Sequence, residues 1–200
     1  LLGTQMVAKG LNLPNVTLVG VLDADLSLYT GGYLAGETTF NMLTQVVGRA
    51  GRGDSPGKAI IQTMVPYHQV IRYAAEQDYD GFYDLEIQLR RVQNAPPFGD
   101  LAVVVVTGRE ETAALRGAAK FRDSLIACLR QEAYREERCA VLGPAPCAVP
   151  KVNYHFRYQL TLRCRLTRTM RQLLSYLLRE FGKDKANRGV SAYIDVNGFD

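Results

Sequence analysis

Apolar positions in the first half of the chain predict two strands with a helix between them. Residues 16–22 form a continuous apolar run ended by two aspartates, which is typical of a strand buried on both faces of a parallel sheet. Residues 37–49 predict a helix and residues 58–63 a second strand. One face of that helix carries Phe40, Leu43 and Val47. This order predicts half of an α/β sheet domain.

The second half of the chain predicts a small α+β unit. Two helical stretches, residues 67–77 and 79–93, lead to the paired prolines of residues 95–97, where we place a domain boundary. The predicted elements beyond it are a strand at 101–107, a helix at 110–134, a short strand at 140–142, a proline-rich loop at 143–150, a strand at 154–164, a helix at 168–181 and a strand at 190–196. This order predicts a β-α-β-β-α-β arrangement.

Charge is unevenly distributed along the chain. Residues 1–100 hold 7 Lys and Arg against 10 Asp and Glu, whereas residues 141–200 hold 10 against 4. The basic final third favours a polyanionic partner, and a basic face that is simply solvated explains the same charge equally well.

Composition excludes several classes of protein. No apolar run is long enough for a membrane span and no signal peptide opens the chain, so we expect a cytoplasmic protein with no membrane partner. The first residues read as a strand entered midway, which favours a truncated chain. The four cysteines have no Cys-x-x-Cys spacing, which argues against a local zinc site and favours free, largely buried thiols. They are Cys128, Cys139, Cys147 and Cys164.

The residues most suited to chemistry lie at the end of the first predicted helix. Gln45, Arg49 and Arg52 are spaced i, i+4 and i+7, which puts them on one helical face opposite the apolar stripe. Two guanidiniums and an amide on one side can bind a triphosphate through bidentate hydrogen bonds. A solvated helix end, where arginine favours the helix dipole, is the alternative.

The stretch Gln-Val-Val-Gly-Arg-Ala-Gly-Arg at 45–52 resembles the sixth signature motif of superfamily 2 helicases. Gly-Thr-Gln-Met-Val-Ala-Lys-Gly at 3–10 resembles the fifth motif as it occurs in the PriA family of bacterial replication-restart helicases. The resemblance continues along the chain in the sequences at 95–98, 142–146, 156–159 and 193–196.

The resemblance implies part of an ATP-dependent 3′→5′ DNA helicase that binds stalled forks and restarts replication through primosome assembly. Residues 1–77 would form the C-terminal part of a RecA-like lobe 2, residues 78–97 a helical linker, and residues 98–200 a domain that binds DNA and partners. Branched and single-stranded DNA, the single-stranded-DNA-binding protein and other primosome proteins are the implied partners, and an association with the bacterial nucleoid follows.

The resemblance also implies roles for individual residues. Arg52 would be the arginine finger, Arg49 a second phosphate contact, and Gln45 a link between nucleotide and lobe. ATP and Mg²⁺ would be held mainly by another lobe, since the sequence has no phosphate-binding loop. The family's zinc would lie outside these residues, and the fragment alone would be inactive. The remaining residues expected at the ATP and DNA cleft are Thr4, Gln5, Lys9, Gly10, Asp23 and Asp25.

Alternatives stay open for several of these residues. Thr4 and Gln5 could cap a strand end, and Asp23 and Asp25 could either orient the arginines or form a plain turn at a strand end. A non-catalytic module for docking DNA and protein, or a fragment of an RNA helicase, are the alternative functions.

The C-terminal residues carry two further expectations. Lys151, Arg157 and Tyr158 lie among interleaved cations and aromatics that suit DNA binding, although Phe156 and Tyr158 could instead pack inward. The segment from Lys151 is less basic than the family pattern, which weakens that contact. Arg168 and Gln172 lie in the first turns of a helix that Thr167 could cap, and the resemblance places the acidic tail of the single-stranded-DNA-binding protein there. Ordinary surface residues are the alternative.

Overall fold

The computed structural model describes residues 3, 16–30, 32–50 and 57–197. The described residues divide into two compact units, with the boundary between Val92 and Gln93. We call them the N-terminal unit and the C-terminal unit, and each is described by itself.

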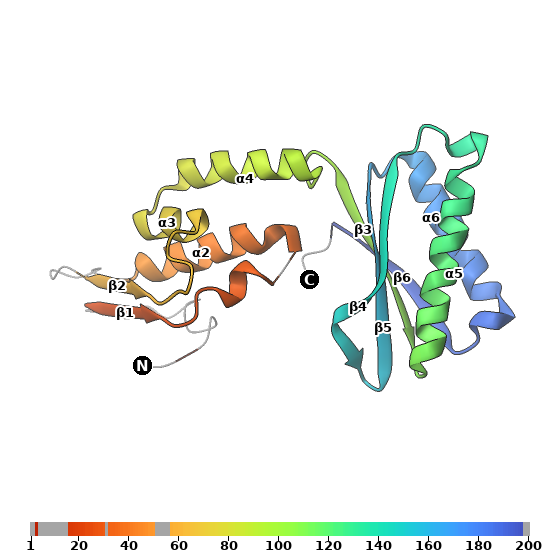
Figure 1. Cartoon of the computed structure of the whole chain (residues 1–200), viewed down its shortest axis with the longest axis horizontal. Helices are drawn as coiled ribbons and strands as arrows, with labels where there is room; N and C mark the ends of the chain where they lie inside the picture. The colour runs from red at the N-terminus through yellow and green to blue at the C-terminus, as the bar shows by residue number, and fades with distance from the viewer. Residues whose placement is uncertain (1–2, 4–15, 31, 51–56, 198–200) are drawn as a thin grey trace. The chain divides into compact units, whose positions relative to one another are not determined.

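The N-terminal unit is a two-stranded parallel sheet with helices over one face (Figure 1). Strands β1 and β2 pair in register from Leu18 opposite Lys58 to Val21 opposite Ile61. The core between sheet and helices centres on Phe40, Leu43 and Phe82, and the rings of Phe40 and Phe82 stack 4.1 Å apart. Its elements are β1 (Leu18–Val21), η1 (Leu26–Leu28), η2 (Gly32–Leu34), α2 (Ala35–Val47), β2 (Lys58–Ile61), α3 (Gln69–Glu76) and α4 (Tyr79–Gln93). The predicted order of strand, helix and strand is therefore confirmed.

The two strands are not buried on both faces, which corrects the sequence-based expectation. Alternate residues of β1 and β2 are exposed, so that Leu18 keeps 60% and Ile60 49% of its surface accessible. The reason is that the helices of this unit cover one side of the sheet only. An apolar face of this kind is typical of parallel sheets whose second side is covered by further structure.

A charged cluster joins helix α4 to helix α2. Arg90 pairs with Glu37 at 2.6 Å and with Glu86 at 2.9 Å, and its guanidinium lies 5.4 Å from the centroid of the Tyr33 ring. The side chains of Arg90 and Glu86 are only 14% and 13% exposed. Gly36 leaves room for the carboxylate, because a Cβ there would lie 3.0 Å from Glu86 Oε2.

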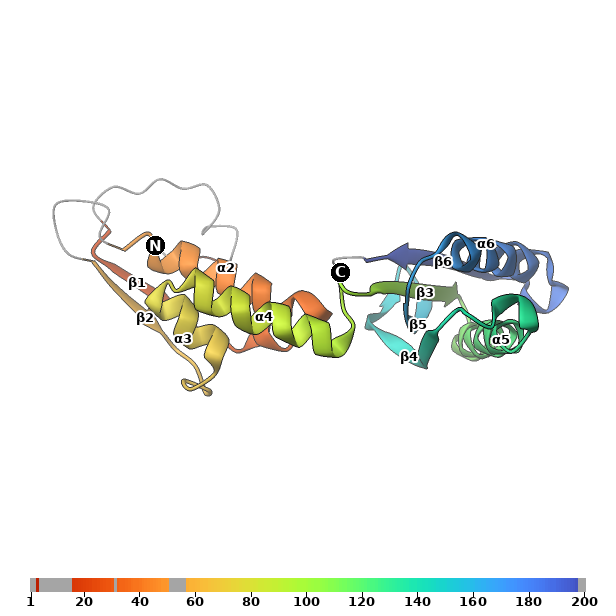
Figure 2. The same ribbon diagram turned by 90° about the horizontal axis from the view of Figure 1, so that it is seen from above.

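The C-terminal unit has a four-stranded antiparallel sheet with strand order β4-β5-β3-β6. Helices α5 and α6 lie on the same face of this sheet (Figures 1 and 2). The elements are β3 (Asp100–Gly108), α5 (Glu111–Leu129), η3 (Glu132–Tyr134), β4 (Cys139–Val152), β5 (His155–Cys164), α6 (Arg168–Lys183), η4 (Lys185–Asn187) and β6 (Val190–Val196). The β-α-β-β-α-β order was predicted, and this topology is the split β-α-β sandwich.

Period-two alternation explains why both helices cover one face. Val104 and Val106 of β3 and Leu160 and Leu162 of β5 are fully buried beneath the helices. The helices contribute the apolar residues Phe121, Leu125, Met170, Leu173 and Phe181 to the same core.

The segment from 143 to 150 is a strand, not the loop that its prolines predict. It belongs to β4, which continues through Cys139–Val152 with register shifts between Leu142 and Ala145 and between Pro146 and Lys151. A proline lacks the N–H that a central strand must donate, but β4 is an edge strand paired only with β5. The prolines are tolerated there because the outer side of an edge strand donates no hydrogen bond to a neighbouring strand. The register shifts accommodate the residues that cannot pair with β5.

The carboxylate of Asp100, at the start of β3, binds two segments of the C-terminal unit that are far from it in the sequence. Asp100 Oδ2 accepts the backbone N–H of Leu166 at 2.9 Å, and its Oδ1 accepts the side-chain amide of Asn197 at 3.1 Å. Asn197 Oδ1 in turn accepts the N–H of Leu101 at 2.8 Å. The Leu166 N–H, followed by the Asn197 amide, holds the pKa of Asp100 below its ordinary value.

We predict that Asp100→Asn lowers the free energy of unfolding by about 1.5 kcal/mol at pH 7. An amide can replace one of the two acceptors, but its NH₂ group would then face the NH₂ of Asn197. Because the pKa of Asp100 is lowered in the folded state, its stabilisation is present above about pH 4 and is lost as pH falls through the lowered value. Urea unfolding should show the difference from wild type shrinking below pH 4.

The matched control is Asp123→Asn on α5, whose side chain is 64% exposed and pairs with its neighbour Arg122. This variant should unfold like wild type both at pH 7 and below pH 4. An equal loss in both variants, or a loss in Asp100→Asn that does not depend on pH, would contradict the role given to Asp100.

Candidate DNA and partner interface

Two of the three residues predicted to contact a triphosphate, Gln45 and Arg49, lie at the end of α2. Gln45 is exposed on α2, on the side away from the buried Phe40 and Leu43. The helix ends at Val47, earlier than predicted, and Arg49 follows in a turn in which its N–H bonds to Val46 O at 3.1 Å. Gly48 is the C-cap residue of α2 and keeps a right-handed conformation, so Arg49 lies in the turn directly after the helix.

Five of the predicted cleft residues lie outside the residues that the structure describes. They are Thr4, Gln5, Lys9, Gly10 and the predicted arginine finger Arg52. Their roles stay predictions.

The aspartates after β1 lie near the other end of α2. Asp25 accepts hydrogen bonds from the Thr63 hydroxyl and, at 2.7 Å, from the Met64 N–H. The Met64 N–H and then the Thr63 hydroxyl hold the pKa of Asp25 below its ordinary value. Helix α2 is 13 residues long, so about 20 Å separate its two ends. Asp25 lies near the first end, whereas Arg49 follows the last. Asp25 therefore orients the segment after β2 and not Arg49.

Asp23 is exposed and takes a left-handed conformation, with φ +51°. The next residue, Ala24, donates its N–H to Gln62 O at 3.1 Å. Both aspartates thus belong to the turn where β1 ends beside the end of β2, which favours the turn interpretation.

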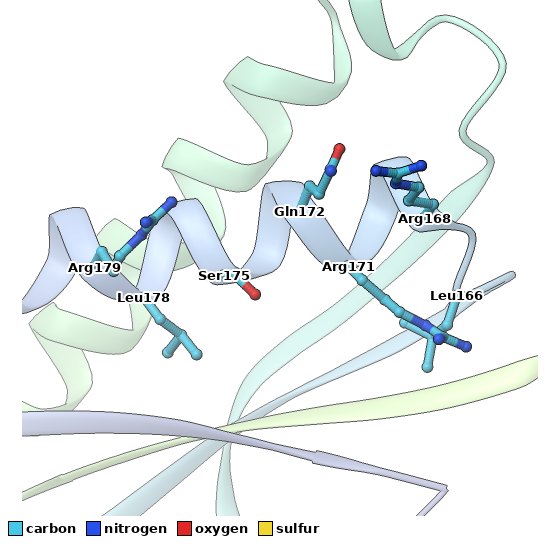
Figure 3. Close-up of a pocket in the computed structure, with 7 residues that line it drawn as sticks. All are labelled: Leu166, Arg168, Arg171, Gln172, Ser175, Leu178 and Arg179. Carbon is cyan, nitrogen blue, oxygen red and sulfur yellow. The ribbon is translucent and has the colours of Figure 1, made fainter.

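Three arginines line a shallow groove along α6, about 710 Å³ in volume. Figure 3 shows two rows of side chains on one face of the helix, with Arg168, Gln172 and Arg179 along one edge and Arg171, Ser175 and Leu178 along the other. Leu166, just before the helix, completes the lining. Within the described residues none of the three arginines forms an ion pair, and the first turn carries no acidic residue. The groove is therefore suited to an anionic ligand.

The start of α6 is held by Thr167, as the sequence predicted. Its hydroxyl accepts the Met170 N–H at 3.0 Å and donates to Glu137 Oε1 at 2.6 Å. This cap sets the first turn of α6, from which Arg168 and Gln172 project.

The three residues predicted to bind DNA do not form one cluster. Lys151 lies over the ring of Phe156, with Nζ 4.3 Å from the centroid. Arg157 lies on the sheet face without helices, where its guanidinium donates to the Tyr193 hydroxyl at 3.2 Å. Tyr158 lies on the helix face, packs against the core and donates its hydroxyl to Glu111 at 3.0 Å, which raises the pKa of Tyr158.

A second depression, about 450 Å³ in volume, lies at the turn between β4 and β5. It is lined by Arg109, Lys151, Asn153 and Tyr154. The sequence argument missed Arg109, because only the pairing of β3 with β5 brings it to this turn. It also missed Arg171 and Arg179, whose helical spacing from Arg168 was visible in the sequence.

Among the residues described, no group of three or more His, Cys, Asp and Glu side chains could hold a metal ion, and all four cysteines are free thiols. In that same part of the chain, no helix has the length and apolar character needed to cross a membrane.

Comparison with known proteins identifies the family. Residues 91–198, more than half of the chain, match the family described as "Primosomal protein N C-terminal domain". The chain belongs to the PriA family. The resemblance predicted from the sequence is thus confirmed.

Named relatives of this PriA-family chain cover nearly its whole length. It is 38% identical over 199 residues to the replication restart protein PriA of Bacillus subtilis, which covers 100% of the chain and 24% of the relative. It is 38% identical over 166 residues to PriA of Synechocystis, covering 82% and 19%, and 34% identical over 197 residues to PriA of Chlamydia muridarum, covering 98% and 25%. The chain therefore spans a quarter or less of the length of these relatives.

We predict that Thr167→Ala lowers the free energy of unfolding of the C-terminal unit by about 1 kcal/mol, because the Met170 N–H loses its acceptor. Thr167→Ser keeps that acceptor and should stay close to wild type. Urea unfolding followed by far-UV circular dichroism measures both. Equal stability of the alanine variant and wild type would show that the cap does not hold α6.

Proposed function

We propose that this PriA-family chain acts in replication restart, as part of an ATP-dependent 3′→5′ DNA helicase that recognises stalled forks. Its relatives are named "Replication restart protein PriA", which supports a role in replication restart. The observation that carries the proposal is the family match over residues 91–198 together with the helicase-like motifs at 3–10 and 45–52.

We infer that the N-terminal unit is part of a RecA-like lobe. The parallel pairing of β1 and β2 and their exposed apolar face support this, because such strands belong to larger sheets covered on both sides. Gln45, Arg49 and Arg52 would then contact ATP bound with Mg²⁺ on another lobe. In this role Arg52 stabilises negative charge that develops on the transferred phosphoryl group.

We predict that Arg52→Ala in the full-length protein lowers DNA-stimulated ATP hydrolysis by a factor of about 10³ or more, while DNA affinity stays nearly unchanged. Arg72→Ala, which removes an exposed arginine from α3, is the control and should keep normal turnover. Steady-state kinetics and DNA-binding titrations measure the two properties. Lost DNA binding with normal turnover would reject the arginine-finger role.

We infer that the C-terminal unit binds two anionic partners. Of the three residues predicted to bind DNA, Lys151 on β4 and Arg157 on β5 would contact branched or single-stranded DNA, with other primosome proteins assembling nearby, whereas Tyr158 packs against the core. The α6 groove would hold the acidic tail of the single-stranded-DNA-binding protein, since a carboxylate is the natural partner of Arg168 beside the Gln172 amide. The three arginines without ion pairs in the described residues support this assignment.

The second candidate is a non-catalytic module that docks DNA and protein. It is favoured by the position of both candidate surfaces in the C-terminal unit, and by the lack of a phosphate-binding loop in this sequence. ATP hydrolysis by the longer protein, abolished by Arg52→Ala, would decide against it.

We predict that Arg168→Ala weakens binding of an acidic tail peptide about tenfold or more, because a hydrogen bond to a charged group is lost. Gln172→Ala should have a smaller effect, since its amide is neutral. Fluorescence anisotropy of a labelled peptide measures the affinity. Arg116→Ala, an exposed arginine of α5, is the control, and equal losses at Arg168 and Arg116 would show only a general charge effect.

A further inference from the structure

The turn between β4 and β5 holds a tyrosine in an unusual conformation. Val152 pairs with His155, which leaves Asn153 and Tyr154 as the two residues of the turn. Their φ angles are +47° and +63°, as a type I′ turn requires. Asparagine and glycine suit such positions, whereas a bulky side chain rarely adopts them.

Nothing in the packing of the unit explains why Tyr154 stands at this position. Its side chain is 84% exposed, and within the described residues its ring contacts no other aromatic ring and its hydroxyl has no hydrogen-bond partner. Glycine would remove the unfavourable conformation at no cost in buried area. A strained, exposed aromatic ring at the tip of a hairpin is therefore a candidate for contact with a ligand.

Two cations, Lys151 and Arg109, lie beside the Tyr154 ring because of the strand register. Phe156 of β5 pairs with Lys151 of β4 on one side and with Gly108 of β3 on the other, so Arg109 follows at the same end of the sheet. The Phe156 ring holds the Lys151 ammonium 4.3 Å from its centroid. Within the part of the chain described, neither Lys151 nor Arg109 forms an ion pair.

Within the described residues, the two glutamates that follow Arg109 form no ion pair with Lys151 or Arg109. Glu111 accepts a hydrogen bond from the Tyr158 hydroxyl at 3.0 Å. Glu110 follows Arg109 directly and is exposed at the first turn of α5. The depression itself is lined by the two cations, Asn153 and Tyr154 and by no carboxylate.

We propose that this hairpin site binds one unpaired nucleotide of DNA, with the base stacked on the Tyr154 ring and the adjoining phosphates held by Lys151 and Arg109. The inference rests on the proposed function and extends it to Tyr154 and Arg109, which are not assigned there. An exposed ring can stack only on a base whose face is free, which favours a single strand over a continuous duplex. Two cations beside the ring match the charge of a backbone that passes the stacked base.

The test uses this 200-residue chain and a labelled oligothymidylate that carries one 2-aminopurine. Tyr154→Gly should lower affinity about fivefold or more, the loss that one base stack causes, and should weaken the quenching of 2-aminopurine. Tyr154→Phe keeps the ring and should bind like wild type. The melting temperature of the glycine variant should equal or exceed that of wild type, so that lost binding is not lost folding.

The cations are tested by salt dependence. Lys151→Ala and Arg109→Ala should each reduce the slope of log K against log salt concentration by about 0.7, the value for one phosphate contact on a single strand. Arg138→Ala, at the other end of β4, is the matched control and should leave the slope unchanged.

The outcomes separate this inference from the proposed function. If wild type does not bind the oligonucleotide, DNA binding by the C-terminal unit fails, and the hairpin site with it. If wild type binds and Tyr154→Gly binds equally well, only the hairpin site is wrong. Equal losses for Tyr154→Gly and Tyr154→Phe would reject stacking, and an equal loss of affinity for blunt duplex would reject the single-strand preference.

Discussion

Strand β3 is the element on which the C-terminal unit depends. It pairs with β5 on one side and β6 on the other, and its alternate residues form the floor of the core under α5 and α6. Its first residue, Asp100, holds the segment that begins α6, while its last residue, Gly108, lies opposite Phe156 next to the hairpin turn. One strand thereby fixes both candidate surfaces, the start of the α6 groove at one end and the hairpin site at the other.

The part of the fold that could be predicted from sequence is the part with clear periodicity. The alternation in β5 and β6 and the apolar stripe of α6 gave nearly correct bounds, because one face of each element is buried. The start of β4 was predicted at 140–142, but its continuation through 143–150 was not, since the prolines argue against a strand and the position at the sheet edge tolerates them. The exposed face of β1 and β2 was missed for a related reason. An apolar sequence predicts a strand with apolar faces, but it does not show whether another element covers each face.

The residues of the candidate sites also divide into those that local sequence features predict and those that depend on the folded structure. Arg168 and Gln172 could be found from helical spacing and the Thr167 cap, which are local features. Arg109 and Tyr154 could not, because their meeting depends on strand register and on the φ angles of a two-residue turn. The position of Asp25 after a strand is visible in the sequence, whereas its hydrogen bonds from the Thr63 hydroxyl and the Met64 N–H depend on the pairing of β1 with β2.

The length of β3 also bears on whether the two surfaces can work together. Nine residues in a strand span about 26 Å between the first and last Cα atoms, and the first turn of α6 and the hairpin turn lie toward opposite ends of β3. Charges on the surface are screened beyond about 8 Å at physiological salt. Two anionic ligands, an acidic peptide on the first turn of α6 and a nucleotide at the hairpin, would therefore repel each other little. The basic charge of this unit is better described as two separate sites than as one continuous patch, so occupation of one leaves the other available.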